Sequence, residues 1–511
     1  MPESARSTAW AERITSAVAR VYDVAKRTPL TNAERLSASV SNTVLLKRED
    51  QQPVFSFKLR GAYNRIATLP EAALVNGVIC SSAGNHAQGV ALAAKLRGCR
   101  AVIVMPATTP DIKVNAVRAL GGDVVLHGDT YDDAAAHAKA LSTAQSLTFV
   151  HPFDDDEVIA GQATIGVEIT EQCSAPPYAV FVPIGGGGLA AGVGLAIKQQ
   201  WPQTKVIGVE PEQAASMLAA REAGHPVTLE RVGMFADGVA VRRVGDKTFD
   251  VVAEVVDEII TVNTDQTCAA IRDIYEDTRT VVEPAGALAV AAIHRYVQAH
   301  ELHDETLVGI VCGANLNFDR LRHIAERAAV GEQREALFAV RIDETPGSFR
   351  RFCDALGPLA VTEFNYRYSG DTDARIFVGV ALRNGKKEQH DILTRITKAG
   401  YRAEDISDNE LAKLHLRHLA GGRGAGLQAE RLFRFEFPER PGALRDFLSA
   451  IGNNVNISLF HYRNHGSDYG RILVGVQVPD EAQTAFDAHL AQLGFWFVEE
   501  TDNAAAKLFL G

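Results

Sequence analysis

Apolar and polar residues are arranged in two different ways along the chain. Up to about residue 325, short runs rich in β-branched residues lead into Ala-rich helical segments. The runs are GVIC at 77–80, AVIVMP at 101–106, AVFVPI at 179–184 and KVIGVEP at 205–211. Strands that alternate with helices are typical of a parallel α/β sheet with helices on both faces. In such sheets ligands collect at the carboxyl ends of the strands.

Beyond about residue 325 the chain contains an internal repeat. ETPGSFRRFCDALG at 344–357 matches ERPGALRDFLSAIG at 439–452, and FNYR from Phe364 matches FHYR from Phe460. Each copy begins with an alternating strand, and its Pro-Gly pair then opens a helix, because proline suits the first helical turn. Two strands, a helix and a final strand complete a βαββαβ unit. Two copies indicate a duplicated sensor or assembly domain, with a purely structural dimerisation tail as the alternative.

These patterns divide the 511 residues into five parts. We expect an α/β domain of two subdomains at 1–325, a neck at 326–335, a first module at 336–419, a Gly-rich spacer at 420–430 and a second module at 431–511.

Composition and charge narrow the class of protein. The chain is 46% hydrophobic and 23% charged, which is ordinary for a soluble globular protein. A net charge of -11 argues against nucleic acid or an anionic membrane as the main partner. The six cysteines show no CxxC pair and no metal-ligand spacing, which predicts free thiols and no metal site. Neither a secretory signal nor a membrane span is expected, so the default location is the cytoplasm.

Four consecutive glycines, Gly185 to Gly188, stand between a buried strand and an Ala-rich helix. Their backbone N–H groups can converge on one anion, and the helix N-terminus adds partial positive charge. No Walker lysine follows, and the spacing is not the GxGxxG of dinucleotide folds. The motif therefore predicts a phosphate site of another kind, with a merely flexible loop as the alternative.

Lys58, in the stretch PVFSFKLRGAY, follows Phe-Ser-Phe, which is an unusual place for a solvated side chain. It is either a helix-start lysine that reaches water or an amine held for chemistry. The turn SSAGNHAQG at 81–89 offers backbone N–H groups to a carboxylate at a helix N-terminus. A phosphate cradle, a poised lysine and a carboxylate turn on one α/β scaffold suit pyridoxal phosphate (PLP), which a lysine amine binds through its aldehyde.

The stretches LKREDQQPVFSFKLRGAY, SSAGNHAQGVA, PIGGGGL, EPAGAL and CGANLN resemble the serine/threonine dehydratases of the fold-type II PLP enzymes, which have a tryptophan synthase β-like fold. The duplicated tail, with FNYR and FHYR, resembles the two ACT-like regulatory modules of the long biosynthetic threonine deaminases. The resemblance covers essentially the whole chain. Its motifs are modest singly and specific as a set.

The resemblance implies a role for individual residues. Lys58 would carry PLP, Asn85 would hydrogen-bond the 3-oxygen of the cofactor, and Cys312 would face the pyridine nitrogen. By itself, Cys312 at a strand end reads as a small buried residue. The phosphate would be bound by Gly185, Gly186, Gly187, Gly188 and Leu189. The substrate carboxylate would be bound by Ser82, Ala83, Gly84, Asn85 and His86.

The implied reaction is deamination of L-threonine, and also of L-serine, with 2-oxobutanoate and ammonia as the products from threonine. Lys58 would take the α-proton as a general base. The implied control is inhibition by isoleucine through the two modules, opposed by valine. Tyr366 and Tyr462, at matching places in the repeats, are candidate effector contacts, with core aromatics at strand ends as the alternative. The family also implies a homotetramer.

Three alternatives stay open from the sequence. A serine dehydratase, serine racemase or catabolic threonine deaminase would share the first half but not the doubled tail. A fold-type II enzyme of β-replacement would use the same lysine and glycines. A catalytically inactive amino-acid sensor would share the fold without turnover.

Overall fold

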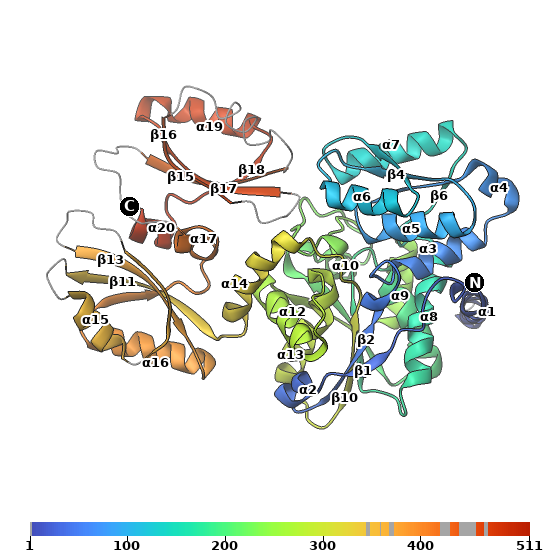
Figure 1. Ribbon diagram of the computed structural model, residues 1–511, viewed down its shortest axis with the longest axis horizontal. Coiled ribbons are helices and arrows are strands. Elements are labelled where there is room, and N and C mark those ends of the chain that lie inside the picture. The colour runs from blue at the N-terminus through green and yellow to red at the C-terminus, as the bar shows by residue number, and fades with distance from the viewer. Residues whose placement is uncertain are drawn as a thin grey trace. The chain divides into compact units, whose positions relative to one another are not determined.

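The computed structural model describes residues 3–343, 348–357, 359–366, 373–418, 430–438, 456–463 and 469–510. The contacts divide the chain into two compact units, Met1–Phe318 and Asp319–Gly511, which we call the catalytic unit and the regulatory unit. Each is described by itself (Figure 1). The domain boundaries inferred from the sequence stay predictions. Among the described residues, no helix combines the length and the apolar composition that crossing a membrane requires.

The catalytic unit alternates helices and strands from end to end. Its α-helices are α1 (Glu3–Val21), α2 (Glu34–Val40), α3 (Lys58–Ala67), α4 (Glu71–Asn76), α5 (Asn85–Leu96), α6 (Asp111–Ala119), α7 (Tyr131–Ala144), α8 (Asp156–Gln172), α9 (Gly188–Gln200), α10 (Ser216–Ala223), α11 (Asp246–Val255), α12 (Thr264–Thr278) and α13 (Pro284–His300). Short 3-10 turns are η1 (Glu49–Gln51), η2 (Glu212–Ala214) and η3 (Asp237–Val239), and η4 (Phe318–Arg320) spans the boundary between the units.

Two mainly parallel sheets form the frame of the catalytic unit. The strands are β1 (Leu30–Asn32), β2 (Thr43–Arg48), β3 (Val78–Ser81), β4 (Ala101–Met105), β5 (Asp123–Leu126), β6 (Thr148–Phe149), β7 (Ala179–Pro183), β8 (Lys205–Pro211), β9 (Glu258–Val262) and β10 (Thr306–Val311). One sheet has the order β1-β2-β10-β7-β8-β9 and the other β5-β4-β3-β6. Only β1 runs antiparallel to its neighbour. The parallel α/β architecture is thereby confirmed.

The smaller sheet is apolar on both faces because helices cover both. Alternate residues of β3 and β4 point to opposite sides, as the period of a strand requires. Ile79 and Val102 pack with Ala134 and Ala138 of α7. Val78 and Cys80 of β3 pack on the other face, in the cluster that includes residues of α3 and α5. The labelled helices of Figure 1 show the same two layers around β4.

Helix α8 approaches its neighbours closely at glycines. A Cβ added to Gly161 would lie 2.6 Å from the Cα of Gly61 in α3. On the side of α9, a Cβ added to Gly192 would lie 2.5 Å from the carbonyl oxygen of Ile159. Real Cβ atoms do not approach that closely, so side chains at these positions would push the helices apart. Glycines therefore fix how α3 and α9 lie on α8.

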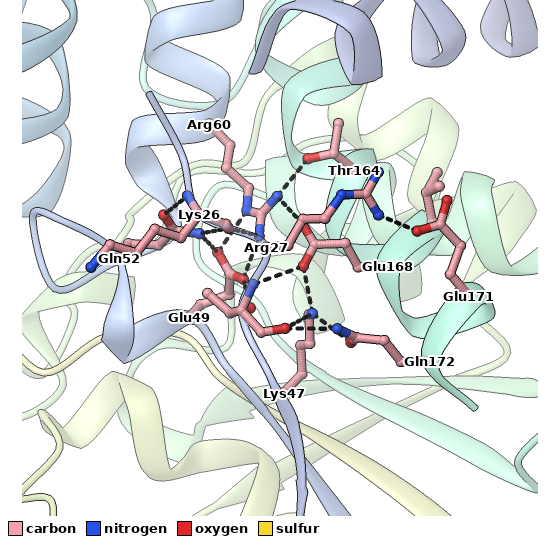
Figure 2. A network of polar contacts seen from close by, with 12 residues as sticks. Lys26, Arg27, Lys47, Glu49, Gln52, Arg60, Thr164, Glu168, Glu171 and Gln172 are labelled. Carbon is pink, nitrogen blue, oxygen red and sulfur yellow. Dashed lines mark hydrogen bonds and ion pairs between the residues drawn. The ribbon is translucent and has the colours of Figure 1, made fainter. Parts of the chain in front are cut away.

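A network of buried charges joins α3 to α8 and β2 (Figure 2). Arg60 donates to Glu49 at 2.7 Å and to Glu168 at 2.6 Å. Lys47 donates to the other oxygen of Glu168 at 2.5 Å. All four of these side chains are fully buried. Further donors to the two carboxylates are Tyr22 Oη, the Thr28 backbone N–H and Thr28 Oγ1. Two cations and two anions thus balance inside the protein.

Burial and pairing compete in this network. Burial alone would lower the pKa of Arg60, but Glu49 and Glu168 raise it above the usual value. For Glu168, burial acts to raise the pKa, and the two cations lower it below the usual value. Partners therefore hold the charges of Arg60 and Glu168, whereas burial lowers the pKa of Lys47 below its usual value. Removing one partner of a buried pair costs about 3–5 kcal/mol because the other is left uncompensated.

The regulatory unit begins with α14 (Leu321–Gly331) and contains two sheets of the same topology. The first module has β11 (Glu335–Asp343), α15 (Ser348–Leu356), β12 (Val361–Tyr366), β13 (Asp373–Ala381), α16 (Gly385–Lys398) and β14 (Arg402–Asp405). The second has β15 (Glu430–Pro438), β16 (Asn456–Arg463), β17 (Tyr469–Gln477), η6 (Asp480–Ala482), α19 (Gln483–Gln492) and β18 (Trp496–Glu499). The orders β12-β13-β11-β14 and β16-β17-β15-β18 are equivalent, with antiparallel pairing throughout.

The repeat seen in the sequence is confirmed in the register of the strands. Phe364 pairs with Val378, and Phe460 pairs with Val474. Both outer strands carry an irregularity at matching places, between Val361 and Glu363 and between Ile457 and Leu459. Residues 420–429 of the spacer predicted at 420–430 lie outside the described residues, and so does the helix expected after the second Pro-Gly pair.

Each module ends in a short helix that the sequence analysis missed. These are α17 (Glu410–Leu414), followed by η5 (Leu416–His418), and α20 (Ala504–Phe509). Residues of both helices share one apolar cluster with strands of both modules, and this cluster includes Leu411, Phe509, Leu337 and Leu473. Helices of five or six residues are not stable alone, so this shared core maintains them.

We expect Arg60→Met to lower the free energy of unfolding by about 3–5 kcal/mol, because Glu49 and Glu168 would remain buried without their shared cation. Urea unfolding followed by circular dichroism measures the change. Arg100→Met is the matched control, since its ion pair with Asp123 is exposed and its loss costs about 1 kcal/mol or less. A loss for Arg60→Met no larger than that of the control would contradict this account.

Candidate active site

Lys58 is the first residue of α3 and is half-buried. Its Nζ donates a hydrogen bond to the carbonyl oxygen of Pro152 at 2.9 Å. Burial lowers the pKa of Lys58 from 10.5 to about 8, although the charge of the nearby Glu283 acts to raise it. A neutral amine is the nucleophilic form of lysine, so this environment makes Lys58 far more reactive near neutral pH than a solvated lysine.

The segment before Lys58 is tied to the segment after β10. Ser56 and Gly313 form an antiparallel bridge, and the Phe57 N–H donates to the carbonyl oxygen of Cys312 at 3.2 Å. Cys312 is 3% exposed, and its Sγ donates to the carbonyl oxygen of Ala285 at 3.3 Å. Burial, with the charge of Glu283, raises the pKa of the Cys312 thiol well above its usual value. Cys312 is therefore a neutral thiol close to Lys58.

The glycine loop follows β7 and opens α9. Gly187 has φ +96°, which favours glycine. A Cβ on Gly186 would collide with the ring of Phe153, the neighbour of the Pro152 that accepts from Lys58. Within the described chain, the N–H groups from Gly186 to Leu189 donate to no acceptor. The loop therefore presents free donors near the lysine.

The turn 82–86 follows β3 and leads into α5. The Gly84 N–H donates to Ser82 Oγ at 3.2 Å, and a Cβ on Gly84 would meet nothing within 4 Å. His86 is buried, and its Nε2 lies 3.0 Å from the carbonyl oxygen of Val150. Burial, with the charge of Lys58, lowers the pKa of His86 to about 3, so its ring is neutral. The turn leaves open space for a small ligand in front of a helix N-terminus.

Close packing of helix α5 on α3 brings the turn to the lysine. A Cβ on Gly89 would lie 3.2 Å from the backbone carbon of Lys58 and from the nitrogen of Leu59. A side chain at this position would press on the backbone of α3 and shift it by a few tenths of an ångström. Gly89 therefore contributes to the site although no chemistry pointed to it.

Two polar residues of the site, Glu283 and Asn315, were not identified from the sequence. Both form hydrogen bonds with Asn85. Asn85 donates through Nδ2 to Glu283 Oε1 at 2.6 Å and accepts at Oδ1 from Asn315 Nδ2 at 2.6 Å. Glu283 also accepts from the Asn315 N–H at 3.2 Å. Burial raises the pKa of Glu283 to about 7. The only sequence signal was that both residues stand in small-residue turns, VEPAGA and CGANLN.

The structure brings Lys58, Asn85 and Cys312 together with the glycine loop at the carboxyl ends of β3, β7 and β10. Tyr366 and Tyr462 lie in the regulatory unit, on β12 and β16, where they pair with equivalent isoleucines of β13 and β17. The side chains of both tyrosines lie outside the described residues, so their role as effector contacts stays a prediction.

The residues of this site fit PLP. Free N–H groups at a glycine loop and helix N-terminus suit a dianionic phosphate. The amine of Lys58 has the lowered pKa that attack on an aldehyde requires. The neutral Cys312 thiol offers a weak, uncharged partner to a ring nitrogen.

Comparison with known proteins gives the same assignment. Residues 21–313 match the family of pyridoxal-phosphate dependent enzymes, and residues 326–416 and 421–510 match the C-terminal regulatory domain of threonine dehydratase. The chain is 54% identical over 495 residues to the biosynthetic L-threonine dehydratase IlvA of Burkholderia multivorans, covering 96% of this chain and 97% of the relative. It is 52% identical over 492 residues to the biosynthetic enzyme IlvA of Escherichia coli, covering 96% of this chain and 95% of the relative.

Solved structures agree with this assignment over part of the chain. The processed form of threonine deaminase isoform 2 from Solanum lycopersicum is 49% identical with a TM-score of 0.62, covering 63% of this chain and 89% of that one. Maize serine racemase is 33% identical with a TM-score of 0.58, covering 61% of this chain and 95% of that one. The fold-type II catalytic fold is thereby confirmed, and so are the cofactor and the resemblance seen in the sequence. This chain belongs to the biosynthetic threonine dehydratases, the PLP-dependent enzymes that carry a C-terminal regulatory domain.

Proposed function

We propose that Lys58 carries PLP and takes the α-proton in the conversion of L-threonine to 2-oxobutanoate and ammonia. The observation that carries this assignment is geometric: the Lys58 amine donates to the carbonyl oxygen of Pro152, and the glycine loop packs on the next residue, Phe153. The lowered pKa of Lys58 is consistent with it. When bound, PLP supplies an electron sink for the negative charge left at the substrate α-carbon.

The other residues of the site bind and orient. The N–H groups of Gly185, Gly186, Gly187, Gly188 and Leu189 hold the cofactor phosphate. Asn85 donates to the 3-oxygen, and Cys312 faces the pyridine nitrogen. The turn formed by Ser82, Ala83, Gly84, Asn85 and His86 holds the substrate carboxylate at the start of α5. The free space at Gly84, in front of a helix N-terminus, supports this placement.

Lys58 itself is the base that removes the proton from the α-carbon of the substrate. Its Nζ is oriented by the carbonyl oxygen of Pro152, and burial keeps part of the amine neutral near pH 7. A positioned base of this kind typically gives about 10²–10⁴-fold in rate.

We also propose that the regulatory unit binds isoleucine as inhibitor and valine as its antagonist, and that the enzyme is a cytoplasmic homotetramer. The match of residues 326–416 and 421–510 to the regulatory domain of threonine dehydratase supports effector binding in this unit. The equivalent register of Tyr366 and Tyr462 supports two related effector positions.

Turnover tests the catalytic assignment directly. We expect the purified enzyme to release 2-oxobutanoate from L-threonine and millimolar isoleucine to suppress the release. Lys58→Ala should abolish turnover, because no other amine replaces the covalent partner of PLP. The products are measured with and without isoleucine, with L-serine as a second substrate. Turnover by Lys58→Ala near that of the unaltered enzyme would refute the role of Lys58, and turnover indifferent to isoleucine would refute the proposed effector.

The pKa of Lys58 predicts how attachment of PLP depends on pH. Only the neutral amine attacks the aldehyde, so the attachment rate should rise with pH and reach half its maximum near pH 8. Adding PLP to the apoprotein at pH 6–10 and following the visible absorbance measures this rate. Lys58→Ala, which lacks the amine, is the blank. A midpoint near 10.5, the value of a solvated lysine, would contradict the buried environment.

Exchange of Tyr366 or Tyr462 for alanine tests the effector positions. We expect each exchange to raise the isoleucine concentration for half-inhibition by about 5–150-fold, the usual range of an allosteric coupling. Tyr275→Ala, an exposed tyrosine of the catalytic unit, controls for loss of an aromatic residue. If both variants keep the isoleucine response of the control, these tyrosines are not effector contacts.

A further inference from the structure

The side-chain amide of Asn85 is fixed at both ends by a chain of hydrogen bonds that starts at backbone groups. The carbonyl oxygen of Val54 can only accept, so Asn315 must present its NH₂ group there, at 2.8 Å. The same NH₂ donates at 2.6 Å to Oδ1 of Asn85. The Nδ2 of Asn85 must then face Glu283, at 2.6 Å.

Glu283 completes a closed ring with Asn85 and Asn315. Its Oε1 accepts from Asn85, and its Oε2 accepts from the backbone N–H of Asn315 at 3.2 Å. A carboxylate that accepts on both oxygens is the form this ring requires, because a protonated oxygen would face a donor. Glu283 therefore serves as the acceptor on which the orientation of Asn85 depends.

Glycines from two other segments make room for this carboxylate. A Cβ on Gly313 would collide with Oε1 of Glu283 and would lie 3.3 Å from Nδ2 of Asn85. A Cβ on Gly238 would lie 3.4 Å from the same Oε1 and 3.1 Å from the Cβ of Ala285. The position of Glu283 is thus limited by α5, which carries Asn85, by η3, which carries Gly238, and by the turn at Gly313.

The charged and titratable groups around Glu283 come from four segments. After burial, Asp237 of η3 acts to raise its pKa, and Lys113 of α6 acts to lower it. Lys113 and Asp237 form an ion pair with each other at 2.8 Å. In return, the charge of Glu283 raises the pKa of Lys58 and of Cys312. One carboxylate therefore acts on three of the groups assigned to the cofactor: Asn85, Lys58 and Cys312.

We propose that Glu283 is a positioning residue for the cofactor, which holds the Asn85 amide so that its second Nδ2 hydrogen is directed to the 3-oxygen of PLP. This inference rests on the role of Asn85 in the proposed function. One Nδ2 hydrogen is engaged by Glu283, and the other is left for the ligand. Glu283 itself touches neither the substrate nor the reacting atoms.

The experiment uses the holoenzyme and two measurements other than turnover. The first is the rate at which PLP is lost during dialysis, and the second is the pH dependence of the visible absorbance of bound PLP. The variants are E283Q, E283A, N85A and the double variants N85A/E283A and N85A/E283Q. The matched control is E210Q, because Glu210 is also buried, has a pKa raised to about 7 by burial and accepts two backbone N–H groups, from Met217 and Leu218.

We expect E283A to lose PLP about tenfold faster than the unaltered enzyme, a usual coupling between hydrogen-bonded neighbours. In the N85A background the same exchange should change the rate less than about twofold, because the group that Glu283 orients is already gone. E283Q should shift the midpoint of the absorbance titration to lower pH, since removing the carboxylate removes a charge that favours the protonated nitrogen of Lys58. E210Q should match the unaltered enzyme in both measurements.

Equal effects of E283A with and without Asn85 would overturn the proposal, since Glu283 would then act only on the fold. Wild-type PLP retention by E283A would overturn it as well. If E283A does not fold, the cycle of E283Q with N85A decides in the same way. If N85A alone keeps PLP as firmly as the unaltered enzyme, the proposed role of Asn85 is wrong, and the inference falls with it. Loss of PLP by N85A but not by the Glu283 variants refutes the inference alone.

Discussion

The buried ion pairs of Arg60 with Glu49 and Glu168 are the interactions on which the catalytic unit depends most. Arg60 lies two residues after Lys58 on α3 and holds that helix to Glu49 before it and to Glu168 of α8 (Figure 2). The charges balance only when all segments are in place, so a displaced α3 would leave several ions buried without partners. The start of α3, and with it the amine of Lys58, is fixed by this requirement. Close contact at Gly61 and Gly161 fixes the same helix sterically.

The active site is built around Lys58, the first residue of α3, which precedes Arg60 by two residues. Lys58 is depressed in pKa by burial, whereas the glycine loop supplies donors that find no acceptor within the described chain. Asn85 is held by Glu283 and Asn315, which come from separate turns. A scaffold of rigid elements therefore carries small, polar and incompletely satisfied groups. That combination suits an enzyme that binds a charged cofactor and a small amino acid.

Local motifs were predictable from the sequence and long-range polar contacts were not. The glycine loop, Lys58 and the turn before α5 were found because each is a short stretch whose composition carries its own chemistry. Arg60 and Glu168 are 108 residues apart, and single charges in a sequence look like solvated ones. Glu283 was missed because its partners, Asn85 and Asn315, are 198 and 32 residues away in the sequence and meet it only in the fold.

In the two regulatory modules, too, local patterns were predictable from the sequence and long-range packing was not. Their strands were predicted from alternation and from the internal repeat, and the register confirms the repeat. The terminal helices α17 and α20 were missed because they are too short to show a period and form only in a shared core.

Native-state hydrogen exchange of the α3 backbone amides tests most directly the claim that the charge network holds the lysine-bearing helix. The account predicts that amides of α3 (Lys58–Ala67) exchange as slowly as those of α8, because opening α3 would strand buried charges. The short helix α4 (Glu71–Asn76), with one buried residue, should exchange much faster. Exchange of α3 as rapid as that of α4 would show that the network does not fix the helix, and the central claim would be wrong.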